Sequence, residues 1–364
     1  MLISGYYGFG NPGDEAILAS MAGALRRAIP GVRITVLSAD PPRTERWHQV
    51  KAVKRTSPRG VLAAVLRAHL LISGGGGLLQ DVTSVRSLAY YLGIIGLAQR
   101  FGKPTMLYAN SFGPIRTRAG RRLARGIVNR MDLVTVRDEL SLQELAALGI
   151  NHPPAYLTAD PALALEPPGP SPGKQVLARE GIPEGPGPLV VISLRNWRGT
   201  DRYLEAVART GDYLAHAYDS RVLFLPLQWD QDYHVALRVK GQMNHPSYIM
   251  KRGCLPGELL SLTGMAHLVI GMRLHSLIFA AVSRVPMVGI IYDPKVRGFL
   301  QQVDQPAAGE VETLEFDSLR RAVDNAFRRH SELARSLGER LPPLRELALK
   351  NAELAAALLR GQLP

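Results

Sequence analysis

The residues of this chain best suited to chemistry are Arg273 and His275, in the segment Gly-Met-Arg-Leu-His-Ser at 271–276. They follow the apolar run at 266–270, which predicts a short buried strand. Arginine is a permanent cation that fits a carboxylate or a phosphate, and histidine transfers protons near neutral pH. This spacing indicates chemistry on an anionic substrate. An arginine paired with a carboxylate, beside a histidine satisfied in the core, is the structural alternative.

Two further cations follow expected strands. Lys295 comes just after the strong apolar run at 287–290, so we expect it at the same sheet edge as Arg273. Arg137 follows the apolar run at 133–136. A solvated lysine, and an arginine paired with the aspartate that caps the next helix, are the alternatives. Together with Arg273 and His275, Lys295 makes three cationic or titratable groups at one sheet edge, which favours an anion site.

The segment Gly8–Gly13 matches the G-x-G-x-x-G pattern of dinucleotide-binding loops, and Asp40 lies where a ribose-binding acid would be expected. However, Asp14 and Glu15 occupy the first turn of the helix that follows, where their charges would repel a pyrophosphate. Carboxylates there suit sugar hydroxyls, as acceptors or as a general base. Simple helix capping is the structural alternative.

A second glycine run, Gly74–Gly77, follows another buried strand and is followed by Gln80 and Asp81. Consecutive glycines are entropically costly, and they expose backbone N–H groups that can line an anion. We therefore expect a ligand at this loop, with Gly75 and Gly76 at its centre.

Trp229 lies between Gln228 and Asp230 at the end of another expected strand. An indole beside amide and carboxylate groups is an arrangement often used to bind sugars, although it is also common at the edge of a core. No cluster of His or Cys has metal-ligand spacing, so we expect no metal site.

Strand and helix patterns alternate along the chain, which predicts parallel sheets covered by helices on both faces. We expect an α/β protein with two Rossmann-like parallel-sheet domains that face a cleft. The helical tail at 316–359 is expected to break at Pro342-Pro343, and its end could pack back on the first domain. The expected parts are an N-terminal acceptor-side domain at 1–165, a Pro/Gly-rich linker at 166–188, a C-terminal donor-side domain at 189–335, and C-terminal helices at 336–364.

Composition narrows the class of protein. The chain has 364 residues, a formal net charge of +13 and one cysteine. No apolar run is long enough to span a membrane and no leader peptide is evident, so we expect a cytoplasmic protein. Basic residues lack interleaved aromatics, so we expect no nucleic-acid partner. Peripheral contact with the anionic inner face of the cell membrane is compatible with the charge.

Five segments together resemble the polysaccharide pyruvyl transferase family, in particular the bacterial enzymes that pyruvylate a lipid-linked sugar for S-layer anchoring. The segments lie at 5–15, 73–81, 136–139, 271–276 and 292–295. The resemblance implies a GT-B-like fold, phosphoenolpyruvate as co-substrate with no other cofactor, and a pyruvate ketal as product. The resemblance does not fix the acceptor; we expect a sugar of the N-acetylmannosamine type on a lipid-linked cell-wall glycan precursor. The resemblance also places Arg137, Arg273, His275 and Lys295 in the donor and catalytic site.

These observations give specific expectations for the site. The expected catalytic residues are His275, Asp14 and Lys295. The expected donor-binding residues are Arg137, Arg273, Lys295, Gly75 and Gly76. The expected acceptor-binding residues are Asn11, Asp14, Glu15, Gln80, Asp81 and Trp229. The alternatives are a GT-B nucleotide-sugar glycosyltransferase, an NAD-binding Rossmann protein and a non-catalytic binder of anionic surfaces.

Overall fold

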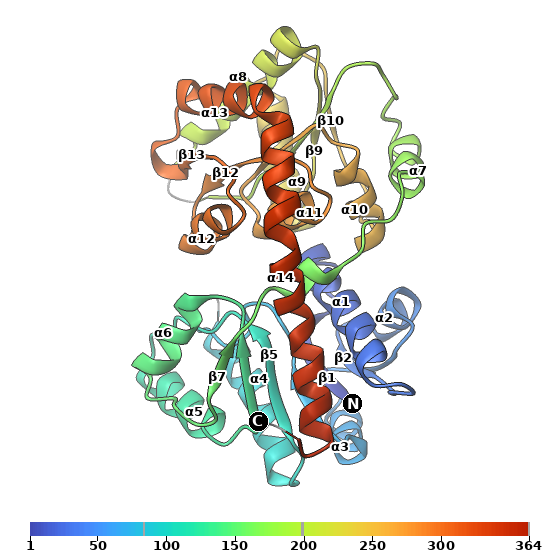
Figure 1. Ribbon diagram of the computed structural model, residues 1–364, viewed down its shortest axis with the longest axis vertical. Helices are drawn as coiled ribbons and strands as arrows, with labels where there is room; N and C mark the ends of the chain where they lie inside the picture. The colour runs from blue at the N-terminus through green and yellow to red at the C-terminus, as the bar shows by residue number, and fades with distance from the viewer. Residues whose placement is uncertain (83, 198–199, 363–364) are drawn as a thin grey trace. The chain divides into compact units, whose positions relative to one another are not determined.

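The computed structural model describes residues 1–82, 84–197 and 200–362. The chain divides into two compact units, each built around its own sheet (Figure 1). The first unit consists of Met1–Phe9, Asp14–Leu165 and the chain from Leu344 onward. The second unit consists of Gly10–Gly13 and Glu166–Pro343.

The first unit holds a seven-stranded sheet in which all strands are parallel, in the order β3-β2-β1-β4-β5-β6-β7. Its central strands are buried almost throughout, because helices cover both faces. The strands are β1 (Leu2–Tyr7), β2 (Thr35–Ser38), β3 (Lys51–Lys54), β4 (Leu71–Ser73), β5 (Thr105–Asn110), β6 (Leu133–Val136) and β7 (Ala155–Leu157).

Polar caps begin most helices of the first unit. Ser57, Thr117 and Asp138 each accept a hydrogen bond from the backbone N–H three residues on, which satisfies one orphan donor of the helix that follows. The helices are α1 (Pro12–Ala28), α2 (Pro41–His48), α3 (Pro58–Arg67), α4 (Val85–Arg100), α5 (Arg118–Val128), α6 (Glu139–Ala147) and the 3-10 helix η1 (Pro161–Ala164).

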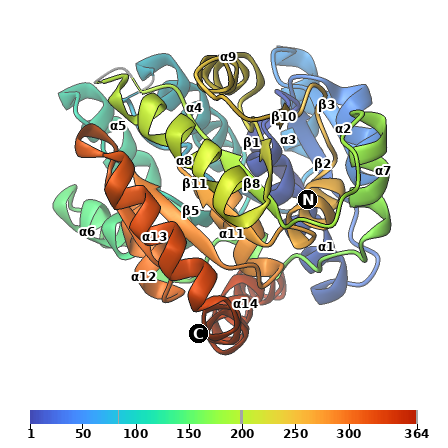
Figure 2. The same cartoon turned by 90° about the horizontal axis from the view of Figure 1, so that it is seen from above.

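The second unit holds a six-stranded parallel sheet in the order β10-β9-β8-β11-β12-β13. The strands are β8 (Leu189–Ser193), β9 (Arg221–Phe224), β10 (Ser247–Ile249), β11 (Leu268–Gly271), β12 (Met287–Ile291) and β13 (Ala307–Glu310). Figure 2 shows helices α8 (Arg202–Tyr218) and α13 (Phe316–Arg328) side by side over this sheet. The other helices are α7 (Ser171–Arg179), α9 (Trp229–Lys240), α10 (Pro256–Gly264), α11 (Leu274–Val282), α12 (Pro294–Gln302), the 3-10 helix η2 (Val311–Thr313) and α14 (His330–Leu359).

Both sheets reverse strand order beside their first strand, as in the doubly wound Rossmann arrangement. The two sheets confirm the predicted fold class of two parallel-sheet α/β domains. The sequence patterns missed the short strands β3, β7, β10 and β13, which lie at the outer positions of their sheets. Strands such as Lys-Ala-Val-Lys of β3 bury little apolar surface, so their hydrophobic pattern is weak.

The expected break at Pro342-Pro343 is wrong, because helix α14 continues through both prolines. Both prolines are exposed, so water can solvate the carbonyl groups that lose their backbone donors. A buried stripe also runs along this part of the helix, and it consists of Leu337, Leu341, Leu344 and Ala348. Burial of this stripe maintains the helix across a locally unfavourable sequence.

The end of α14 belongs to the first unit, where Asn351 is fully buried. Its side-chain oxygen accepts hydrogen bonds from Thr135 at 2.5 Å and Thr158 at 3.1 Å. These contacts tie the C-terminal segment to strand β6 and to the residue after β7. Within the described residues, no helix is both long enough and apolar enough to cross a membrane.

Candidate functional site

The first candidate region is the carboxyl edge of the seven-stranded sheet, where β1 and β4 are neighbours and the strand order reverses. Open α/β sheets bind ligands at this position. Two glycine-rich loops leave the sheet here, one after β1 and one after β4. A backbone bridge between Gly76 and Asn110 joins the second loop to the end of β5.

Gly74, Gly75 and Gly76 of this loop pack so closely against their neighbours that a side chain would crowd them. A Cβ added to Gly74 would lie 2.2 Å from the Tyr7 hydroxyl oxygen. Gly76 has φ +97°, and its added Cβ would lie 3.0 Å from Oδ1 of Asp14. The structure therefore brings Gly76 and Asp14, both predicted site residues, into contact.

Asp14 lies in the first turn of α1 and is partly exposed. Burial, followed by the charges of Glu15 and Asp160, raises the pKa of Asp14 from 3.8 to about 8, although Arg137 opposes this shift. A carboxyl group with such a pKa exchanges its proton close to neutral pH. This is the property that a general base needs.

Arg137 follows β6, and its side chain is 9% exposed. It forms a close ion pair with Asp160 and a longer one with Asp138 at 3.9 Å. The pairing with the adjacent aspartate, foreseen as an alternative, is thus present, but Asp160 is the nearer partner. The sequence analysis missed Asp160, because its contact with Arg137 spans 23 residues and no local spacing reports it.

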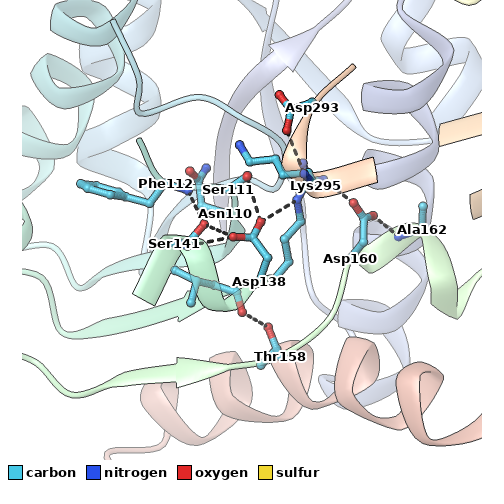
Figure 3. Close-up of polar contacts among 12 residues, drawn as sticks. Asn110, Ser111, Phe112, Asp138, Ser141, Thr158, Asp160, Ala162, Asp293 and Lys295 are labelled. Carbon is cyan, nitrogen blue, oxygen red and sulfur yellow. Dashed lines mark hydrogen bonds and ion pairs between the residues drawn. The ribbon is translucent and has the colours of Figure 1, made fainter. Parts of the chain in front are cut away.

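Both aspartates are held by neighbouring groups (Figure 3). Asp138 accepts hydrogen bonds from the Ser111 hydroxyl at 3.0 Å and from the Ser141 backbone N–H at 2.8 Å. Asp160 accepts from the Ala162 backbone N–H at 2.9 Å. The guanidinium of Arg137 is therefore fixed by carboxylates that are themselves anchored.

Glu15 is 1% exposed, and internal contacts occupy both its oxygens. Oε1 accepts from the Gly8 backbone N–H at 2.9 Å, and Oε2 lies 2.7 Å from Nε2 of His48. Asn11 accepts from the Gly13 N–H at 3.0 Å, and Asp40 caps α2. Glu15 and Asn11, predicted to bind the acceptor, and Asp40, the candidate ribose-binding acid, therefore contact the protein's own groups around the loop after β1.

Asp81 likewise holds the protein's own backbone. Its carboxylate accepts from the Arg116 and Thr117 backbone N–H groups, each at 2.8 Å, and from the Thr117 hydroxyl at 2.7 Å. Burial alone would raise the pKa of Asp81, but these hydrogen bonds outweigh it and lower the pKa. Gln80, just before it, is partly exposed.

The second candidate region is the carboxyl edge of the six-stranded sheet. Strands β11 and β12 pair in parallel, so Arg273 and Lys295, which follow them, leave the sheet at the same edge. Arg273 donates from Nε and Nη2 to the two oxygens of Asp232, at 3.0 and 2.5 Å. Nη2 also donates to Oε1 of Gln228 at 3.0 Å.

Asp232 is 1% exposed and also accepts from the backbone N–H of Gln228 at 2.8 Å. This bidentate pair fixes the plane of the Arg273 guanidinium. Asp232 lies 41 residues before Arg273, on α9, and the sequence analysis did not single it out. The only available hint was the polar segment that leads into α9.

His275 lies in the first turn of α11 and is partly buried. In the same unit, a Cβ added to Gly13 would lie 2.2 Å from its Nδ1, so the imidazole rests against the Gly13 backbone. Lys295 is also partly buried, and its backbone N–H donates to Asp293, the N-cap of α12, at 2.9 Å (Figure 3).

Aromatic side chains accompany these groups. Trp229, the first residue of α9, stacks on Tyr233 with ring centroids 5.2 Å apart. The guanidinium of Arg195, just beyond β8, lies 4.4 Å from the ring centroid of Tyr292, just beyond β12. The predicted residues Trp229, Arg273, His275 and Lys295 thus follow strands β9, β11 and β12 of the second sheet, whereas those of the first unit follow β1, β4 and β6.

Solved structures define the class of fold. Over the whole chain, the S. aureus MnaA–UDP co-structure matches with a TM-score of 0.67 at 9% identity, covering 97% of that chain. Anabaena HepE in complex with UDP-glucose matches with 0.65 at 12% identity, covering 100% of this chain and 99% of that one. UDP-GlcNAc 2-epimerase from Neisseria meningitidis matches with 0.64 at 11% identity, covering 99% and 100%. The fold is therefore that of GT-B-like glycosyltransferases and UDP-GlcNAc 2-epimerases.

The sequence model of one family, polysaccharide pyruvyl transferase, matches residues 11–294. The chain belongs to this family, whose members are transferases, and the predicted resemblance is confirmed. No curated protein sequence matches the chain significantly.

Proposed function

We propose that the protein transfers the pyruvyl group of phosphoenolpyruvate to two hydroxyls of a sugar, forming a ketal and releasing phosphate. Family membership supports the pyruvyl transfer. The pairing of β11 with β12 carries the donor assignment, because it brings Arg273, His275 and Lys295 to one edge of a single sheet. A permanent cation, a titratable imidazole and an ammonium together suit a donor with a carboxylate and a phosphate.

In this proposal the second unit supplies the main cationic side chains that bind the donor. Arg273, oriented by Asp232, pairs with one anionic group of phosphoenolpyruvate through its remaining nitrogen, Nη1, and Lys295 pairs with the other. A guanidinium held in place loses little freedom on binding. Arg137 and the backbone N–H groups of Gly75 and Gly76 are the proposed donor-binding groups of the first unit.

His275 is the proposed acid. It gives its proton to the methylene carbon of phosphoenolpyruvate, which makes C2 electrophilic. A sugar hydroxyl then forms a bond to C2, and Asp14 takes the hydroxyl proton. The bond between C2 and the phosphate oxygen breaks and phosphate leaves with its electron pair. A second hydroxyl then forms a bond to C2 and closes the ketal, and the released phosphate takes up the proton of that hydroxyl. Because the pKa of Asp14 is about 8, the rate should rise with pH up to about that value.

The proposed acceptor is an N-acetylmannosamine-type residue of a lipid-linked glycan. In this proposal the protein acts in the cytoplasm, at the inner face of the cell membrane. Asn11, Gln80 and Trp229, in addition to Asp14, are the proposed acceptor-binding residues. Glu15 and Asp81 are assigned to supporting these loops, because their oxygens bind the protein's own groups.

Phosphorus NMR tests the proposed reaction. Full-length protein mixed with phosphoenolpyruvate and a lipid-linked N-acetylmannosamine glycan should release inorganic phosphate only when both are present. His275→Ala should lower kcat by about 10²–10⁴-fold, the usual contribution of a general acid. His216→Ala, an exposed histidine on α8, is the matched control and should retain the wild-type rate. Release of UDP from a UDP-sugar, with phosphoenolpyruvate unchanged, would show a glycosyltransferase instead.

A further inference from the structure

Helix α5 carries a stripe of arginines on one face. Its members, spaced i, i+3, i+4 and i+7, are Arg118, Arg121, Arg122 and Arg125, and all four are exposed. Side chains at this spacing lie next to one another on a helix. The opposite face is buried and consists of Gly120, Ala124, Ile127 and Val128. The helix is therefore anchored on one side and strongly basic on the other. We call the four residues the arginine stripe.

The arginine stripe lacks acidic partners. The segment 111–131 contains no Asp or Glu, and exposed Arg116 and Arg130 flank the stripe. In the part of the chain that the structure describes, none of the four arginines is paired with a carboxylate. Like charges at these spacings repel one another, so the bare stripe disfavours its own helix. An anionic partner on this face would remove that repulsion.

We propose that the arginine stripe docks the protein on an anionic lipid bilayer. Clusters of four to eight basic residues on an amphipathic helix bind anionic lipid surfaces. The stripe acts through its charge, because Leu123, although 43% exposed, lies on another side of the helix. The segment 116–130 holds no aromatic side chain on which bases could stack, which favours a bilayer over a nucleic acid.

The docking surface extends the proposed function, because an acceptor carried on a lipid would be met at the bilayer. The docking itself does not depend on the donor or on the reaction. Its test therefore uses no substrate, and failure of the docking and failure of the pyruvyl transfer are separate results.

Co-sedimentation with vesicles tests the docking. Full-length protein should sediment with vesicles of phosphatidylglycerol and phosphatidylcholine and not with phosphatidylcholine alone. The stripe variant replaces all four arginines by glutamine, which is a good helix former. Each basic residue near an anionic surface contributes roughly fivefold to partitioning, so the variant should bind at least about tenfold more weakly. A matched control makes the same charge change at exposed arginines of the second unit, namely Arg202, Arg252, Arg321 and Arg328.

The control variant should sediment as the wild type does. An equal loss of vesicle binding in both variants would show that only the net charge of the protein matters, and it would overturn the proposal. Absence of binding to the anionic vesicles, or tighter binding to duplex DNA than to them, would also overturn it. A second variant, Arg121→Gln with Arg122→Gln, perturbs the helix less and should show an intermediate loss, so the test stands even if the fourfold variant folds poorly.

Discussion

Asp14 combines two properties at the scale of a single residue. It touches the glycine loop after β4, and its pKa is raised by burial and by Glu15 and Asp160. The two carboxylate oxygens of its neighbour Glu15 instead form contacts with Gly8 and His48. Adjacent carboxylates in one helical turn thus serve different purposes, because Glu15 is paired within the described part of the chain and Asp14 is not.

The raised pKa makes Asp14 a source of pH-dependent stability. Between its ordinary value of 3.8 and about 8, the folded state keeps a proton that the unfolded state releases, so the free energy of unfolding falls as pH rises. Asp14→Asn removes this dependence. We expect the variant to melt a few degrees above the wild type at about pH 9 and nearly with it at about pH 4. Thermal melts at both pH values check this, and an equal difference at both would contradict the raised pKa.

At the scale of elements, the loop after β4 is held in a conformation that only glycine adopts without strain. Gly76 has φ +97° and faces Asp14, whereas Gly77 has open space around its Cβ position. Gly76→Ala should therefore destabilise the protein by about 1–3 kcal/mol, the usual range for a strained backbone position. Urea denaturation measures this difference. Gly77→Ala is the matched control and should change stability little; equal losses would refute the strain argument.

The elements also show which features the sequence predicts. Buried strands such as β4 and β11 are continuous apolar runs followed by glycine or charged residues, so both the strands and the groups at their ends were predictable. The partners of those groups were not. Asp232 and Asp160 reach Arg273 and Arg137 across 41 and 23 residues, and only the fold brings them together. Helix α14 continues through two prolines because a stripe of its side chains is buried, and local helix propensity does not report that burial.

At the scale of the whole molecule, the net charge of +13 has two roles in this account. Part of it is gathered in the arginine stripe of α5, outside the candidate site. Another part lies at the carboxyl edge of the second sheet, where Arg273 and Lys295 follow paired strands. The fold is shared with proteins solved with UDP or UDP-glucose, so the ligand must be decided by these side chains rather than by the architecture.

Calorimetric titration with phosphoenolpyruvate tests the central claim most directly. The wild-type protein should bind phosphoenolpyruvate, and Lys295→Gln should weaken binding by about tenfold or more, the loss expected for one charge-assisted contact. Lys295→Gln is preferred to removal of Arg273, which would leave Asp232 buried without its cation. The matched control is Arg252→Gln, at an exposed position of the same unit. Binding of UDP or NAD with no binding of phosphoenolpyruvate would contradict the account.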